Sequence, residues 1–155
     1  MIEIERKFLV KSDEYRSEAF KVQLLSQAYL NNNPKKSVRI RIIDNVGFIT
    51  IKGPSYDGGL SRFEWEKKIS IDEANKLMKI CGDKKIFKKR YFVKHNKIIF
   101  EVDEFLNNNK GLVVAEVELK TTSQKIVFPE WIAEEVTGVN KYYNLSLITK
   151  PFSSW

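Results

Sequence analysis

Cysteine and histidine are scarce in this sequence of 155 residues, which contains only Cys81 and His95. One cysteine excludes an intramolecular disulfide and favours a reducing, intracellular compartment over secretion. One cysteine and one histidine also supply neither the ligands of a zinc site nor a Cys-His dyad, and His95 lies in a predicted turn between lysines. Acid–base chemistry would therefore fall to carboxylates or lysines.

Long apolar runs and two familiar nucleotide-binding loops are missing as well. No apolar run approaches the ~18 residues that cross a bilayer. The first residues, MIEIERKFLV, alternate charged with apolar side chains instead of forming the apolar core of a signal peptide. Neither G-x-x-x-x-G-K-S/T nor G-x-G-x-x-G occurs, so the folds built on those phosphate-binding loops are unsupported. These absences predict a cytoplasmic protein with no membrane partner.

The composition is that of a folded, basic protein. Hydrophobic residues make up 43% of the chain and charged residues 30%, which is typical of a globular protein and argues against disorder. Lysine and arginine outnumber aspartate and glutamate by 27 to 20, and the net charge of +7 suggests a polyanionic partner: nucleic acid, anionic lipid or a phosphorylated metabolite. The length and the lack of an internal linker predict one domain over residues 1–155.

Alternation of apolar and polar side chains with period two is the dominant pattern, and it predicts strands. Short segments rich in Asn, Gly and Asp separate the alternating segments, as in antiparallel hairpins. Helical patterns are fewer and cover residues 12–19, 72–80 and 129–136, with Asp72 as the predicted N-cap of the second helix. We expect strands at residues 2–10, 22–30, 37–43, 47–52, 62–70, 88–94, 98–105 and 112–121.

Sorting the strand residues by parity separates a charged face from an apolar one. An open sheet with one face in water would also show this split. Eight strands, however, form a wide sheet whose exposed edges disappear on closure, so we predict a mainly β, α+β fold. It is a closed eight-stranded antiparallel barrel with a few flanking helices and the charges inside. The charged face comprises Glu3, Glu5, Lys7, Arg39, Arg41, Lys52, Glu64, Glu66, Lys88, Arg90, Glu101, Asp103, Glu116 and Glu118.

The carboxylates of the charged face come in pairs at positions i and i+2, and two arginines, Arg39 and Arg41, do the same. Side chains two apart on a strand stand roughly 6.5–7 Å apart at the backbone, so long carboxylates can converge on one hard ion. Such a cluster is costly unless it is neutralised. An interior that combines carboxylates with lysines and arginines therefore suits divalent metal ions together with a multiply charged phosphate chain.

The N-terminal segment Glu3-Ile4-Glu5-Arg6-Lys7 resembles the ExExK motif that begins members of the CYTH superfamily, the triphosphate tunnel metalloenzymes. Residues 64–68 and 116–120 also match this short motif, so its position at the N-terminus and the order of the other blocks make the resemblance specific. The resemblance extends from Ile2 to about Leu147 and is to the short bacterial members with a single domain. The other blocks are Gln27–Leu30, Val38–Arg41, Thr50–Gly53, Arg62–Glu66, Lys89–Tyr91, Glu101–Phe105, Leu112–Leu119 and Glu135–Thr137.

The resemblance implies an eight-stranded tunnel that hydrolyses a triphosphate, such as inorganic tripolyphosphate or thiamine triphosphate, with Mg²⁺ or Mn²⁺ as cofactor. As metal ligands it implies Glu3, Glu5 and Glu118, with Glu116 close by. As catalytic, phosphate-binding residues it implies Lys7, Arg39, Arg41, Lys52 and Arg90. The positions that hold a second metal ion or orient the attacking water are Glu64, Glu66, Glu101 and Asp103. For Glu64 and Asp103, pairing with neighbouring arginines is an equally good interpretation.

Two other functions stay open. A class IV adenylate cyclase uses the same tunnel to convert ATP to cyclic AMP and pyrophosphate, although no adenine pocket is evident in the sequence. A noncatalytic module for polyphosphate or RNA would use the basic excess alone. RNA is disfavoured because Phe63, Trp65 and Tyr91 fall on the packing face instead of being free to stack on bases. The C-terminal segment Lys141–Trp155 either plugs a tunnel mouth or docks a partner, and a homodimer is one alternative.

Overall fold

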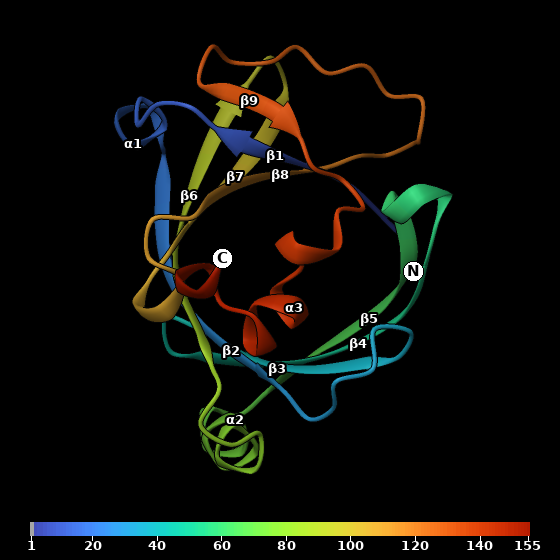
Figure 1. Ribbon diagram of the computed structural model, residues 1–155, viewed down its shortest axis with the longest axis vertical. Helices are drawn as coiled ribbons and strands as arrows, with labels where there is room; N and C mark the ends of the chain where they lie inside the picture. The colour runs from blue at the N-terminus through green and yellow to red at the C-terminus, as the bar shows by residue number, and fades with distance from the viewer. Residues whose placement is uncertain (1) are drawn as a thin grey trace.

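The fold is a closed antiparallel β-barrel, seen end-on in Figure 1, and the computed structural model describes residues 2–155. Neighbouring strands pair in the order β5-β4-β3-β2-β6-β7-β8-β1, and β5 also pairs with β1, which closes the ring and confirms the predicted eight-stranded barrel. The strands are β1 (Ile2–Val10), β2 (Lys21–Tyr29), β3 (Ser37–Ile43), β4 (Val46–Tyr56), β5 (Ser61–Ile69), β6 (Ile86–His95), β7 (Ile98–Phe105), β8 (Val113–Glu118) and β9 (Ile132–Glu135).

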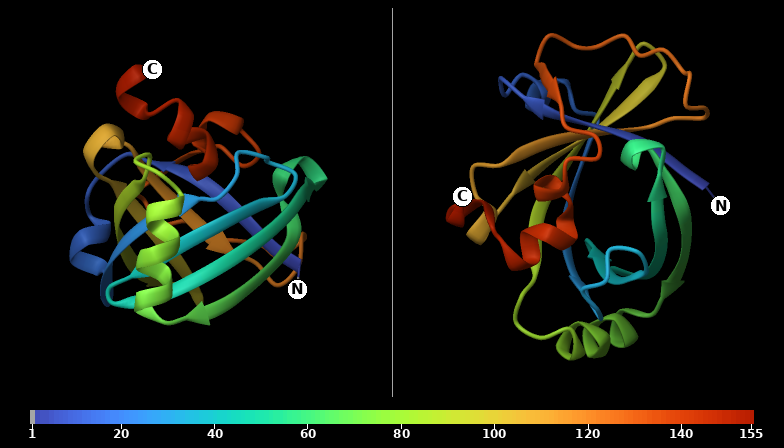
Figure 2. Two further views of the ribbon diagram at one scale, coloured as in Figure 1. Left: turned by 90° about the horizontal axis from the view of Figure 1, so that it is seen from below. Right: turned by 45° about the vertical axis from the view of Figure 1, so that its right-hand side comes forward.

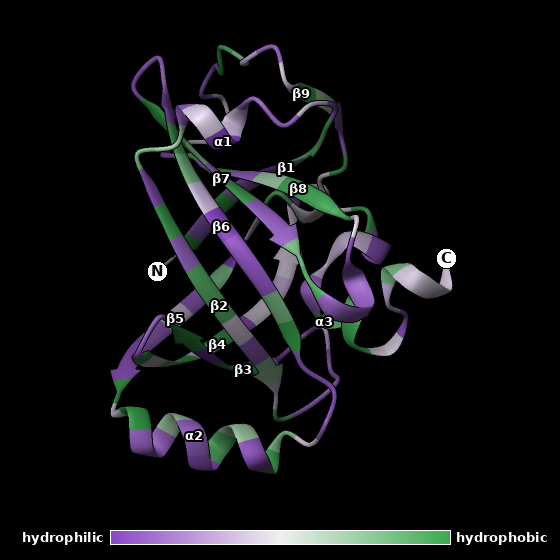
Figure 3. Cartoon of the chain, turned by 90° about the vertical axis from the view of Figure 1, so that its left-hand side faces the viewer, coloured by the Kyte–Doolittle hydropathy of each residue, from purple (hydrophilic) through white to green (hydrophobic). Residues whose placement is uncertain are grey.

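The register between strands places the charged side chains of neighbouring strands on the same, inner face. Glu5 of β1 lies opposite Glu118 of β8, and Arg90 of β6 lies opposite Asp103 of β7. Residues directly opposite one another point to the same side of a sheet, so charged side chains of seven strands face the interior, and β2 contributes Tyr29 there. Figure 3 shows the alternation of hydrophilic and hydrophobic residues along β2 and β6 that results.

The hydrophobic core lies outside the barrel wall, in separate clusters. One cluster joins the outer faces of β1, β6, β7 and β8 to Tyr15 of α1 (Tyr15–Glu18) and to Trp131, which is 1% exposed. A second cluster lies between β2, β3 and the helix α2 (Ile71–Ile80), whose Ala74 and Met78 are buried. Complete burial of a large apolar side chain, such as Met78, stabilises the fold by about 1.5–3 kcal/mol. Figure 2 shows α2 and β9 on opposite sides of the barrel, so its inner face is left to the charges.

The helix predicted over residues 129–136 is wrong, because this segment forms the strand β9. The first residues of β1 pair with β5, from Ile2 to Ile4, and the later part of that edge would be unpaired without another strand. β9 pairs with it, with Phe8 opposite Glu135 and Val10 opposite Ile132. Tertiary pairing thus outweighs the local pattern.

The predicted helix starts also shift. Ser70, not Asp72, is the N-cap of α2: its hydroxyl accepts a hydrogen bond from the Glu73 N–H, and the Glu73 carboxylate accepts one from the Ser70 N–H. This reciprocal pair satisfies two N–H groups that Asp72 would leave free. The turn predicted over residues 12–19 is helical only in the four residues of α1.

The C-terminal segment forms three short helical elements, and one of them lies against the end of the barrel. They are the 3₁₀ turn η3 (Asn140–Tyr142), the helix α3 (Asn144–Thr149) and the 3₁₀ turn η4 (Phe152–Ser154); two further 3₁₀ turns are η1 (Asp57–Gly59) and η2 (Asn107–Asn109). Leu147 of α3 is buried against Ile86, Phe105, Leu112 and Val114. None of the helices within residues 2–155 is long and apolar enough to span a membrane.

Candidate functional site: a charged tunnel inside the barrel

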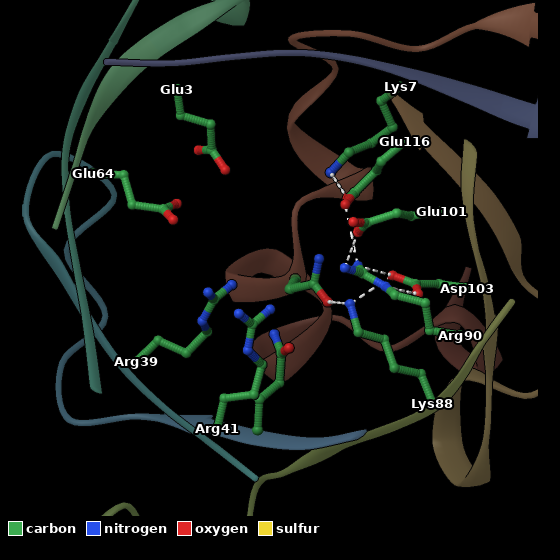
Figure 4. Close-up of polar contacts among 12 residues, drawn as sticks. Glu3, Lys7, Arg39, Arg41, Glu64, Lys88, Arg90, Glu101, Asp103 and Glu116 are labelled. Atoms are coloured by element: carbon green, nitrogen blue, oxygen red, sulfur yellow. Dashed lines mark hydrogen bonds and ion pairs between the residues drawn. The ribbon is translucent and has the colours of Figure 1, made fainter. Parts of the chain in front are cut away.

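The barrel encloses a cavity of about 290 Å³. All eight barrel strands contribute to its wall, because each directs alternate side chains inward. Every site residue predicted from the sequence lines this cavity except Asp103, which lies behind Arg90 and Lys88. The structure therefore brings the predicted residues together, and Figure 4 labels nine of them, together with Lys88, around the interior.

Arg90 is the centre of the most densely paired cluster. Its Nε lies 2.7 Å from Asp103 Oδ1 and its Nη2 lies 2.8 Å from Asp103 Oδ2, while Nη1 contacts Glu101. Lys88 Nζ donates to Asp103 Oδ2 at 2.6 Å. Burial alone would lower the pKa of Arg90, but the negative charge of the paired Asp103 raises this pKa well above its usual value. Asp103 is thus held in ion pairs, with both oxygens occupied.

Lys7 and Glu116 form a neighbouring buried pair, with 3.1 Å between Lys7 Nζ and Glu116 Oε1. Burial alone would raise the pKa of Glu116, but the positive charges of Lys7 and Arg90 hold it well below its usual value. Glu116 is therefore ionised and neutralised by lysine and arginine. Figure 4 shows Lys7, Glu116, Glu101 and Arg90 in a row along one side of the interior.

Arg39 and Arg41 share one carboxylate. Their Nη2 atoms lie 3.4 Å and 3.0 Å from Glu66 Oε2, which also accepts a hydrogen bond from the Thr50 hydroxyl. The Nε of both arginines is buried without a hydrogen-bond partner among residues 2–155. Burial, and next the charge of Arg39, lower the pKa of Arg41 to about 10. This part of the tunnel has more positive charge than its carboxylates neutralise.

Another charged group lies where β1, β4 and β5 meet. Lys52 Nζ lies 2.8 Å from Glu3 Oε2 and 2.7 Å from Glu64 Oε2, and Arg62 Nε lies 3.3 Å from Glu3 Oε2. Burial acts to raise the pKa of Glu64, but Lys52 lowers it overall. The carboxylates of Glu3 and Glu64 therefore lie close together around one lysine.

Glu5 and Glu118 lie opposite one another on β1 and β8, and neither forms an ion pair or side-chain hydrogen bond within residues 2–155. Burial raises the pKa of both carboxyl groups, and neighbouring carboxylates add to it: Glu116 and Glu3 at Glu5, and Glu3 and Glu64 at Glu118. Two facing acids that form no ion pair, Glu5 half-buried and Glu118 exposed at the end of β8, fit a hard divalent cation, which prefers carboxylate oxygens. No group of three or more Asp, Glu, His or Cys side chains in the described part of the chain is already gathered as a complete metal site.

Several lining residues lie outside the set assigned from the sequence. Arg62 has the same parity as Glu64 and Glu66, so the strand pattern contained the signal for it. Lys88 falls on the predicted charged face but received no role; burial lowers its pKa to about 8 despite the adjacent Asp103. Three more lining residues lie on strands: Tyr29, Ser37 and Ser55. Ser37 has the parity of Arg39 and Arg41, so the strand pattern marked it as well, although it carries no charge. The others come from a loop and from the C-terminal segment, where no periodicity marks them: Pro34, Asn140, Tyr143, Asn144, Leu145 and Ser146.

Comparison with known proteins places this tunnel in a family. The family model described as the CYTH domain matches residues 1–150. The chain belongs to the CYTH family. An inorganic triphosphatase of Acetivibrio thermocellus is 40% identical to it over 154 residues, which cover 99% of this chain and 97% of that protein.

Two further CYTH comparisons agree. An inorganic triphosphatase of Nitrosomonas europaea is 33% identical over 152 residues, covering 95% of this chain and 97% of that protein. A crystal structure of an inorganic triphosphatase superposes with a TM-score of 0.65 at 29% identity and covers 94% of this chain and 97% of that one. The resemblance of the sequence to this family is confirmed along nearly the whole chain.

Proposed function

We propose that this CYTH protein is a divalent-metal-dependent triphosphatase that hydrolyses inorganic triphosphate inside the tunnel. One observation carries the proposal: the interior separates two acids that form no ion pair among residues 2–155, Glu5 and Glu118, from two arginines that share a single carboxylate. A divalent cation bound to Glu5 and Glu118, and a polyanion bound to the two arginines, would neutralise both sites. The names of the two curated relatives support inorganic triphosphate as the substrate.

The basic residues would bind the phosphate chain. Arg39 and Arg41 present guanidinium N–H groups to the cavity, and arginine binds phosphate oxygens in bidentate fashion. Lys7, Lys52 and Arg90 are held at fixed positions by carboxylates on neighbouring strands. Positive charge fixed before the substrate arrives stabilises charge that spreads over the transferred phosphoryl group without reorganisation during the reaction.

Mg²⁺ or Mn²⁺ would be held by Glu5 and Glu118 together with Glu3, and Glu116 lies close by on β8. When bound, the metal supplies charge neutralisation for the phosphate oxygens and for the leaving group. The chain's own carboxylates do the rest of the ordering. Glu66 holds Arg39 and Arg41, and Glu64 holds Lys52.

The other acidic residues proposed from the sequence have cationic partners. Glu101 and Asp103 contact Arg90, and Glu116 contacts Lys7. They would reach a second metal ion, or orient water, only after these pairs open. While these ion pairs are formed, the three carboxylates hold Arg90 and Lys7 in position in the tunnel wall.

The activity is tested by incubating the protein separately with tripolyphosphate, thiamine triphosphate and ATP, with Mg²⁺ or Mn²⁺, and analysing the products. We expect phosphate and pyrophosphate from tripolyphosphate, and no turnover after chelation with EDTA. Cyclic AMP with pyrophosphate from ATP would instead establish the cyclase. Tight binding of polyphosphate in EDTA with no metal-dependent turnover of any substrate would leave a binding module.

The metal role is tested by Glu5→Ala and Glu118→Ala. Each should lower turnover by at least about 100-fold, because a lost metal contribution of several kcal/mol raises the barrier by that amount. The unfolding midpoint measured in EDTA should stay unchanged or rise, since each variant removes one of two opposed acids. Glu134→Ala, an exposed carboxylate on β9 outside the tunnel, is the matched control. Wild-type activity in either tunnel variant removes the proposed metal ligand.

A further inference from the structure

The C-terminal segment does more than close the end of the barrel, because two consecutive residues of it contact tunnel lysines. The ring of Tyr143 lies under Lys7, with 5.3 Å between Nζ and the ring centroid. The side-chain oxygen of Asn144 accepts a hydrogen bond from Lys88 Nζ at 3.1 Å. Lys7 and Lys88 are on β1 and β6, so one short segment reaches basic residues on two separate strands.

The contact between Asn144 and Lys88 fixes the direction of the ammonium group. A lysine ammonium has three N–H donors on a flexible four-carbon stem. One donates to Asp103 Oδ2 and one to Asn144 Oδ1, and no further oxygen or nitrogen acceptor contacts it among residues 2–155; the Phe105 ring centroid lies 5.4 Å from Nζ. Two fixed donors define where the third points, and Lys88 lines the cavity. Figure 4 shows Lys88 below Arg90, at the boundary of the open interior.

The chemical type of Asn144 fits this task. Asp103 already neutralises part of the charge shared by Lys88 and Arg90. A second carboxylate would cancel the attraction of Lys88 for a polyanion, whereas an amide oxygen accepts the hydrogen bond without adding negative charge. A neutral acceptor can therefore orient the cation and leave its charge available.

The backbone that carries Asn144 is itself anchored from two sides. Leu147, three residues later, is 1% exposed and packs with Ile86 and Phe105 of the barrel. Gly138, just before the segment, touches the β4–β5 connection so closely that a Cβ there would lie 2.0 Å from the carbonyl oxygen of Gly58. An acceptor on such a support is held in place better than one on a free terminus.

We propose that Asn144 is a positioning residue for Lys88, supplied to the tunnel by the C-terminal segment. The inference rests on the proposed function, since it gives Lys88 a fixed orientation toward the phosphate chain of the substrate. Asn144 touches no reacting atom itself and acts through the lysine.

The test is Asn144→Ala, assayed with tripolyphosphate and Mg²⁺. Lys88 keeps its charge but loses one orienting bond, so kcat should fall about tenfold while KM changes by no more than about twofold. Thr149→Ala is the matched control. Thr149 ends the same helix, and within residues 2–155 its hydroxyl donates a hydrogen bond only to the Ser146 carbonyl, so this variant should behave like the unchanged protein. Thermal unfolding midpoints of both variants show whether a loss of kcat comes from a destabilised α3 or from a misplaced Lys88 in an otherwise stable fold.

Two more variants make the result decisive. Asn144→Asp keeps the acceptor and adds a charge, so kcat should recover toward the wild-type value while KM rises. In a Lys88→Met background, Asn144→Ala should change kcat no further, because the residue through which it acts is gone. Wild-type kcat in Asn144→Ala, or a full tenfold loss in the Lys88→Met background, overturns the inference. Absence of tripolyphosphate turnover in the unchanged protein overturns the proposed function instead, and the inference with it.

Discussion

At the scale of single residues, the tunnel contains two kinds of buried charge. Arg90 contacts Asp103, Glu101 and Glu116, so its desolvation is offset by three carboxylates. Arg41 has only the Glu66 carboxylate, which it shares with Arg39, and its Nε has no partner in the described chain. A buried cation with incomplete compensation costs stability but is ready to bind an anion.

This difference predicts that replacing an arginine by methionine changes stability differently at Arg41 and at Arg90. Arg41→Met should raise KM for tripolyphosphate about tenfold, the loss of one charge-assisted contact. Its free energy of unfolding in EDTA should stay within about 1 kcal/mol of wild type or increase. Arg90→Met removes the cation that three carboxylates share: Asp103 keeps Lys88 and Glu116 keeps Lys7, but Glu101 loses its ion pair. Breaking this buried network should destabilise the fold by about 3–5 kcal/mol. Urea unfolding and steady-state kinetics check both, and equal destabilisation by the two variants would contradict this division.

At the scale of elements, the C-terminal segment depends on a close contact between two glycine-containing turns. Gly138 has φ +74° and Gly58 has φ +67°, so both adopt left-handed backbone that favours glycine. A Cβ on Gly138 would lie 2.0 Å from the Gly58 carbonyl oxygen, whereas a Cβ on Gly58 would meet nothing within 4 Å. The two positions share the backbone strain and differ in the steric clash.

Gly138→Ala should therefore displace the segment that carries Tyr143 and Asn144, and Gly58→Ala should not. Both should lose about 1–2 kcal/mol of unfolding free energy from the left-handed backbone. Only Gly138→Ala should also lower kcat for tripolyphosphate, by roughly tenfold if Asn144 moves by about 1 Å. Denaturant unfolding with parallel kinetics makes the comparison. Identical kcat values would show that the segment tolerates the shift.

At the scale of the whole molecule, the barrel closes through its shortest seam. β1 and β5 share three residue pairs, from Ile2 opposite Phe63 to Ile4 opposite Ser61, whereas β6 and β7 share eight. The seam is also where Glu3, Lys52 and Arg62 meet in the tunnel. Local stability follows the number of interactions, so this joint should open more readily than the rest of the ring.

Hydrogen exchange tests this expectation. Backbone amides of residues 61–63 should exchange faster than those in the centre of β6, because fewer pairs must separate. Tripolyphosphate added in EDTA should slow exchange at the seam, since a ligand that binds the closed ring shifts the opening equilibrium. The β6–β7 turn at residues 96–97 serves as the internal control and should not change. Slower exchange at the seam than in β6 would contradict the closure argument.

The sequence by itself determined the barrel strands and the residues inside the tunnel. Period-two alternation is a local property of extended chain, and in a closed sheet every strand has one inner face, so parity alone selected Glu3, Arg39 and Glu118 as interior residues. Only the tertiary structure decided β9, the pairing of Asp103 and the contact of Asn144 with Lys88. Those depend on which edge lacks a partner and on which segment packs at the tunnel end, and both are contacts between residues far apart in the chain that no local pattern encodes.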